Sequence, residues 1–131
     1  MTQEREFDPL EFLRVADELV TDDADEATLR TAIGRAYYAI FLLARTKTGV
    51  QGRRNAHERV REAISPVNDR LASLLGTIAT ARYFADYELL PANSNFSDWR
   101  LNWERVRRNI DLALEELNRL PDMTVREASN E

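Results

Sequence analysis

The sequence has no cysteine and only one histidine among its 131 residues. These absences exclude disulfide frameworks, thiolate nucleophiles, zinc ribbons and metal sites built from several histidines. A di-iron helical bundle is excluded too, because it needs Glu-x-x-His pairs on facing helices. We therefore expect no metal and no cofactor, and the side chains left for chemistry are carboxylates, arginines, tyrosines and His57.

Long apolar runs are also missing. The longest, YYAIFLLA at 37–44, is far shorter than a membrane span, and the acidic N-terminus lacks a basic segment followed by an apolar one. We expect a soluble, cytoplasmic protein that does not enter a membrane. The length of 131 residues predicts a single domain, which can bury roughly two thirds of its unfolded surface.

Charge is unevenly distributed along the chain. The net charge of -5 argues against general affinity for nucleic acid, yet residues 30–70 hold nine basic and three acidic side chains. Residues 1–28 hold ten acids and two arginines. The basic segment has two interpretations: solvated helix faces, or a surface for an acidic partner or RNA.

Helical periodicity and capping residues run through most of the sequence. Asp8 as N-cap, Pro9 at the first helical position and Glu11 predict the start of the first helix. Asn55 with Glu58 predicts a capping box for a short third helix. The predicted helices cover about 9–20, 26–47, 56–65, 69–89 and 98–120, with a core at about 8–120 and a frayed tail at 121–131.

These elements predict an all-α fold, an antiparallel up-and-down bundle of four long helices and one short helix. The second helix has a core stripe at Leu29, Ile33, Ala36, Tyr37, Ile40 and Ala44. Its opposite face carries Thr31, Arg35, Tyr38, Leu42 and Arg45, and is too apolar for plain exposure. We expect that face to meet another helix or another subunit, although Arg35 passing Tyr38 to reach water is an equal alternative.

An arginine lies within the apolar stripe of the fourth helix. The stripe comprises Leu71, Leu74, Leu75, Ile78, Ala85 and Leu89, and Arg82 falls inside it. Because a buried guanidinium without a partner is costly, Arg82 should form an ion pair or line a cleft. Asp86, one turn further on, is the nearest predicted partner.

Three stretches together resemble the HEPN family, the helical domains named for higher eukaryotes and prokaryotes nucleotide binding. They are LRTAIGRAYYAIFLLARTKTG, NAHERVREAI and ARYFADYELL, and the resemblance extends over about 8–120. It implies a bundle that commonly dimerises, and often a neighbouring minimal nucleotidyltransferase with which it forms a toxin-antitoxin pair.

The resemblance also bears on catalysis. Many members are metal-independent ribonucleases, whose site combines an arginine with a histidine four to six residues later, contributed by both subunits. Arg82 matches the motif arginine, but Tyr87 stands where the histidine is expected. A tyrosine with an ordinary pKa near 10 is a poor base at neutral pH. His57 is either a surface histidine at the start of the third helix or a group that reaches the Arg82 cleft.

Three functions remain open at this stage. The first is a binding module that engages a nucleotide, RNA or nucleotidyltransferase partner through a cleft around Arg35, Tyr38, Arg82, Asp86 and Tyr87. The second is a metal-independent endoribonuclease that uses Arg82 with His57, Asp86 or Tyr87 in an atypical site. The third is a helical interaction domain without a ligand. The missing motif histidine favours the first.

We also expect a homodimer. Its interface would use Tyr38 and Leu42 of the second helix, or the aromatic start of the fifth helix at Phe96, Trp99 and Trp103.

Overall fold

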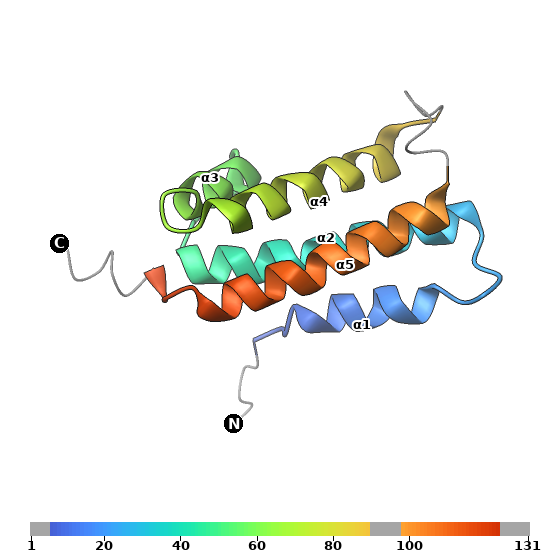
Figure 1. The fold of residues 1–131 in the computed structure, drawn as a ribbon, viewed down its shortest axis with the longest axis horizontal. Helices are drawn as coiled ribbons and strands as arrows, with labels where there is room; N and C mark the ends of the chain where they lie inside the picture. The colour runs from blue at the N-terminus through green and yellow to red at the C-terminus, as the bar shows by residue number, and fades with distance from the viewer. Residues whose placement is uncertain (1–5, 90–97, 124–131) are drawn as a thin grey trace.

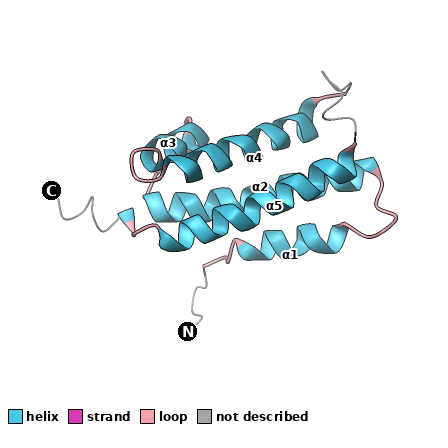
Figure 2. Ribbon diagram, viewed as in Figure 1, coloured by secondary structure: helices cyan, strands magenta, loops and turns pink. Residues whose placement is uncertain are grey.

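The computed structural model describes residues 6–89 and 98–123. Within these ranges the chain forms five α-helices and no strand, which confirms the all-α prediction. Figure 1 shows the chain reversing direction from α1 to α2, from α2 to α4 and from α4 to α5, and Figure 2 distinguishes the helices from the loops that the structure describes. The helices are α1 (Leu10–Leu19), α2 (Glu26–Thr48), α3 (Ala56–Ile64), α4 (Asp69–Tyr87) and α5 (Trp99–Arg119).

Helix α2 lies at the centre of the bundle and packs against each of the other four helices. Asp25 caps its start by accepting the Thr28 backbone N–H at 2.9 Å. Gly49 ends it in a left-handed conformation, with φ 74°. All six residues of the predicted core stripe are buried. The opposite face is not covered by the other helices of the chain: Thr31 and Arg35 are exposed, and Tyr38, Leu42 and Arg45 are half-buried. The expectation that another helix buries this face is therefore wrong, and its burial by a second subunit stays a prediction.

Two predicted helix features are wrong. Helix α1 spans ten residues and α3 nine, so the described bundle has three long helices and two short ones. Asn55 does not cap α3 with its side chain, because its backbone is left-handed, with φ 53°, and makes no side-chain cap bond. The proposed capping box with Glu58 is therefore absent.

The end of α4 also differs from the prediction. The helix stops at Tyr87, and Leu89, expected in the apolar stripe, is 90% exposed. Arg30 of α2 explains the early end, because its guanidinium donates to the carbonyls of Ala85 and Glu88 at 3.3 and 2.6 Å. The same guanidinium lies 4.2 Å from the ring centroid of Trp99. A tertiary contact therefore ends this helix before Pro91, which lies outside the described residues.

The core joins all five helices. Its fully buried side chains include Ile33, Ile40, Val60, Ile64, Leu71, Ile78 and Ile110. Trp99 and Trp103 are each only 6% exposed, so they pack inside this one chain and are not available to a second subunit. Phe96, the third aromatic residue predicted for a dimer interface, lies outside the described residues. None of the described helices has the length and apolar character needed to cross a membrane.

Candidate functional site

The arginine predicted inside the apolar stripe of α4 has two partners. Arg82 Nε lies 3.0 Å from Asp86 Oδ2, and Arg82 Nη2 donates to the Tyr38 hydroxyl at 2.8 Å. The Nε contact is an ion pair without a directed hydrogen bond. The predicted Arg82–Asp86 pair is therefore confirmed, and the hydroxyl of Tyr38 links it to α2. The Arg82 side chain keeps 22% of its surface exposed.

Tyr38 brings a second arginine into the same cluster. The guanidinium carbon of Arg82 lies 5.3 Å from the Tyr38 ring centroid, and that of Arg35 lies 5.8 Å from it. Arg35 also lies 5.4 Å from the ring of Phe12 in α1, and makes no ion pair with any described residue. Two guanidinium groups thus flank one tyrosine ring, and a single carboxylate, that of Asp86, is paired with them.

His57 joins this cluster from α3. Its Nδ1 is hydrogen-bonded to the hydroxyl of Tyr37, and its ring stacks on Phe41 with centroids 4.0 Å apart. The Arg82 guanidinium lies 5.6 Å from the Tyr37 ring centroid. Tyr37 therefore contacts both His57 and Arg82, and of the two predicted places of His57 the structure shows the one near Arg82.

The environment shifts the pKa of both members of the Tyr37–His57 pair. Burial raises the pKa of Tyr37 to about 12, although Arg61 and Arg82 oppose this shift. Burial lowers the pKa of His57 below its usual value, and the positive charges of Arg82 and Arg61 lower it further. Near neutral pH, Tyr37 keeps its proton and His57 is uncharged.

The neutral imidazole of His57 has two tautomers, and the tautomer decides which member of the Tyr37–His57 hydrogen bond donates. If Nδ1 accepts from the Tyr37 hydroxyl, Nε2 carries the proton and is a donor; if Nδ1 donates, Nε2 is an acceptor. In both tautomers Arg35 and Arg82 supply hydrogen-bond donors to the cluster around Tyr38.

Close packing of α2 and α4 positions the cluster. A Cβ atom added to Gly34 would lie 3.7 Å from Asp86 Oδ1, so the carboxylate rests directly over this glycine. A side chain at position 34 would meet Asp86 in ordinary van der Waals contact, so the approach of α4 to α2 does not depend on this glycine. Gly34 immediately precedes Arg35 in the stretch GRAYY. The sequence alone did not predict that Gly34 lies next to Asp86.

Tyr87 lies apart from the cluster. Its side chain is 61% exposed, and its ring packs on Tyr83, with centroids 5.1 Å apart. None of the interactions among the described residues joins Tyr87 to Arg82. The structure therefore brings together Arg35, Tyr38, Arg82, Asp86 and His57 of the predicted site residues, and leaves Tyr87 on the outer face of α4.

Three contributors were missed by sequence reasoning. Tyr37 was assigned to the core, and Phe41 and Arg61 were not singled out. Tyr37 and Phe41 are one turn apart on α2, which was a visible signal for a shared aromatic contact. The described residues contain no group of three or more histidine or carboxylate side chains that could hold a metal ion.

Comparison of the chain with protein-family models, with curated proteins and with solved structures found no match.

Proposed function

We propose that this chain is a HEPN-like, dimeric binding module that engages the phosphate groups of RNA or a nucleotide at the cluster of Arg35, Tyr38, His57 and Arg82. The observation that carries the proposal is the charge imbalance around Tyr38. Two guanidinium groups flank its ring, and one carboxylate is paired with them. Guanidinium groups bind phosphate through paired donors, and a partly buried position strengthens such contacts.

The protonation states of Arg82 and Tyr37 support binding more than catalysis. Metal-free RNA cleavage needs a base that removes the 2'-hydroxyl proton and an acid that protonates the leaving oxygen. In the tautomer of His57 in which Nδ1 accepts from Tyr37, the nitrogen left free is a donor and cannot act as the base. Arginine stays protonated throughout the working range, and the pKa of Tyr37, about 12, keeps that residue protonated as well.

An affinity measurement tests this proposal. Fluorescence anisotropy of a labelled single-stranded RNA would be compared for the natural chain and for Arg35→Ala and Arg82→Ala. We expect each change to weaken binding about ten-fold, because each removes charge-assisted hydrogen bonds to phosphate. Arg14→Ala is the matched control, since Arg14 lies on α1, is exposed and pairs with Glu18.

The affinity of Arg82→Ala for RNA decides between the two roles of this arginine. Equal affinity of Arg82→Ala and the natural chain, with both proteins folded by circular dichroism, would contradict the proposal. If Arg82→Ala instead lowers the melting temperature by many degrees and leaves affinity unchanged, the arginine serves the Asp86 pair alone.

The proposed protein partners follow from the resemblance to the HEPN family. A minimal nucleotidyltransferase would form a toxin-antitoxin pair with this chain, and a second copy would form the homodimer. One surface feature supports a protein contact: Tyr83, Tyr87 and Leu89 are large, exposed and close together at the C-terminal end of α4. Co-purification of the two chains after co-expression tests the nucleotidyltransferase partnership.

The alternative is a metal-independent endoribonuclease, favoured by one observation: His57 and Arg82 both contact Tyr37. In the tautomer in which Nδ1 donates to Tyr37, Nε2 of His57 could accept a proton. We expect no cleavage of single-stranded RNA or tRNA in the presence of a chelator, because no histidine follows Arg82 at the spacing of the motif. Robust cleavage that both Arg82→Ala and His57→Ala abolish would establish the enzyme instead.

A further inference from the structure

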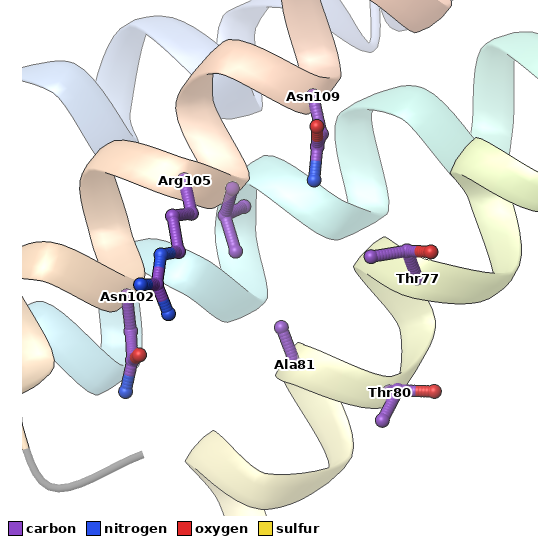
Figure 3. A pocket seen from close by; sticks show the side chains of 7 residues that line it. Thr77, Thr80, Ala81, Asn102, Arg105 and Asn109 are labelled. Atoms are coloured by element: carbon purple, nitrogen blue, oxygen red, sulfur yellow. The ribbon is translucent and has the colours of Figure 1, made fainter. Parts of the chain in front are cut away.

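A groove of about 360 Å³ separates α4 from α5, on a side of α4 that shares no residue with the Arg82 cluster. Figure 3 shows Asn102, Arg105 and Asn109 of α5 along one side and Thr77, Thr80 and Ala81 of α4 along the other. This volume lies in the range of small-molecule sites.

The α4 side of the groove is apolar, because its two threonine hydroxyls are bonded to the backbone of their own helix. The Thr77 hydroxyl donates to the Ser73 carbonyl at 3.1 Å, and the Thr80 hydroxyl donates to the Gly76 carbonyl at 3.0 Å. Figure 3 shows both hydroxyls pointing away from Arg105 and Asn102. The methyl groups of the threonines, with Ala81, therefore form this side of the groove.

Asn102 is a buried polar side chain with an unsatisfied donor. It is 4% exposed, and its Nδ2 has no hydrogen-bond partner. Buried amides in folded proteins are nearly always hydrogen-bonded, because a lost bond to water must be replaced. An unsatisfied donor in the lining of a groove indicates that a bound group supplies the missing acceptor.

Arg105 gives the groove a positive charge. Its side chain lines the groove and makes no ion pair or hydrogen bond with any described residue. No carboxylate is among the lining residues. The polar lining groups thus comprise one guanidinium and two amides, which favours a ligand that is negatively charged and accepts hydrogen bonds.

We propose that the α4–α5 groove binds a small organic carboxylate. One oxygen of the carboxylate accepts from the Arg105 guanidinium, and the other accepts from Nδ2 of Asn102. The apolar body of the ligand packs on Val106, Ala81 and the threonine methyl groups. A monoanion fits better than a phosphate ester, because the groove offers a single positive charge to balance it.

Benzoate is a suitable probe, because it joins a carboxylate to a flat apolar body. Benzoate would be titrated into the ¹⁵N-labelled chain while the side-chain NH₂ signals of Asn102 are followed by NMR. We expect a saturable shift with benzoate, a weaker effect with phenyl phosphate, and no saturable shift with benzamide or benzylamine. Arg105→Gln should weaken benzoate binding about ten-fold.

Arg108→Gln is the matched control, because Arg108 is exposed on α5 and does not line the groove. Its affinity for benzoate should equal that of the natural chain. The proposal is overturned if benzoate produces no saturable shift at Asn102, if benzamide binds as well as benzoate, or if Arg105→Gln and Arg108→Gln weaken binding equally. Asn102→Asp provides a second variant, followed at the side-chain NH₂ signals of Asn109 in the same groove: it places a negative charge in the groove and should abolish benzoate binding.

Discussion

At the scale of single residues, His57 is the side chain that most directly couples the candidate site to pH. Its ring is stacked on Phe41 and hydrogen-bonded to Tyr37, with the positive charges of Arg82 and Arg61 nearby. Burial and the positive charges of Arg82 and Arg61 favour the neutral imidazole. The pKa of His57 is therefore lower in the folded chain than in the unfolded chain, where it is near 6.5.

This difference predicts how stability changes with pH. Below about pH 6.5 the unfolded chain binds a proton at His57 more readily than the folded chain does, so the free energy of unfolding decreases as the pH falls from 6.5 toward the folded pKa. Above pH 6.5 the contribution of His57 is complete. Chemical denaturation between about pH 7.5 and 5.5 measures this slope.

His57→Phe is the variant to compare, because phenylalanine preserves stacking on Phe41 and cannot be protonated. We expect its free energy of unfolding to depend less on pH than that of the natural chain over the same interval. Identical slopes for the two proteins would contradict a lowered pKa for His57.

Residue pairs close in sequence were the predictable part of the site. Arg82 and Asp86 are one helical turn apart, so the periodicity of α4 was sufficient to predict their ion pair. The contact of His57 with Tyr37 depends on how α3 folds back onto α2 across a loop of seven residues, and periodicity carries no such information. The same reason explains why Tyr38, rather than Tyr87, contacts Arg82.

At the scale of helices, Asn55 is the element boundary where the sequence pattern was misleading. Asn is a preferred N-cap, but it is also the residue other than glycine that most readily adopts a left-handed backbone. The chain uses the second property: φ is 53° and the side chain makes no cap bond. The turn that starts α3 therefore needs left-handed geometry at residue 55.

Substitution with serine separates the two roles. Serine caps a helix about as well as asparagine but tolerates left-handed geometry poorly, so Asn55→Ser should lower the free energy of unfolding by about 1 kcal/mol. Asn55→Gly should be nearly neutral. Asp25→Ser at the true cap of α2 is the control and should have a small effect. A neutral result for Asn55→Ser would restore the capping role.

Helix positions were predictable to within a residue or two wherever caps and glycine set the ends. Asp25 and Gly49 bound α2, and Asp98 caps α5 by accepting the Leu101 backbone N–H at 3.0 Å. Helix α4 ends early because Arg30, more than fifty residues away in the chain, binds its last carbonyls. Such a long-range contact cannot be inferred from local sequence.

At the scale of the whole molecule, an ion pair connects the acidic N-terminal segment to α5. Arg107 of α5 pairs with Asp17 of the acidic first helix at 2.8 Å and with Asp111 of its own helix at 2.6 Å. This pair joins the acidic N-terminal segment to α5. In the basic segment, by contrast, Arg35 has no carboxylate partner among the described residues, which leaves a cationic surface near Tyr38.

We predict that two copies of the chain form a homodimer. Light scattering after size-exclusion chromatography should give the mass of two chains, because the exposed Tyr83, Tyr87 and Leu89 provide an apolar contact surface. The double change Tyr83→Ser and Tyr87→Ser should shift the protein toward monomer. Leu101→Ser, an exposed apolar position on α5, is the control and should remain dimeric. A monomeric natural chain at high concentration would refute this prediction.

The central claim is that phosphate binds at the cluster of Arg35, Tyr38, His57 and Arg82. Its most direct test is an NMR titration of the arginine Nε–H signals with a short 5'-phosphorylated single-stranded RNA. The account predicts saturable shifts at Arg35 and Arg82, and none at Arg14 on α1 or Arg107 on α5, which lie outside this cluster. Shifts confined to other arginines, or no saturable shift at Arg35 and Arg82, would contradict it.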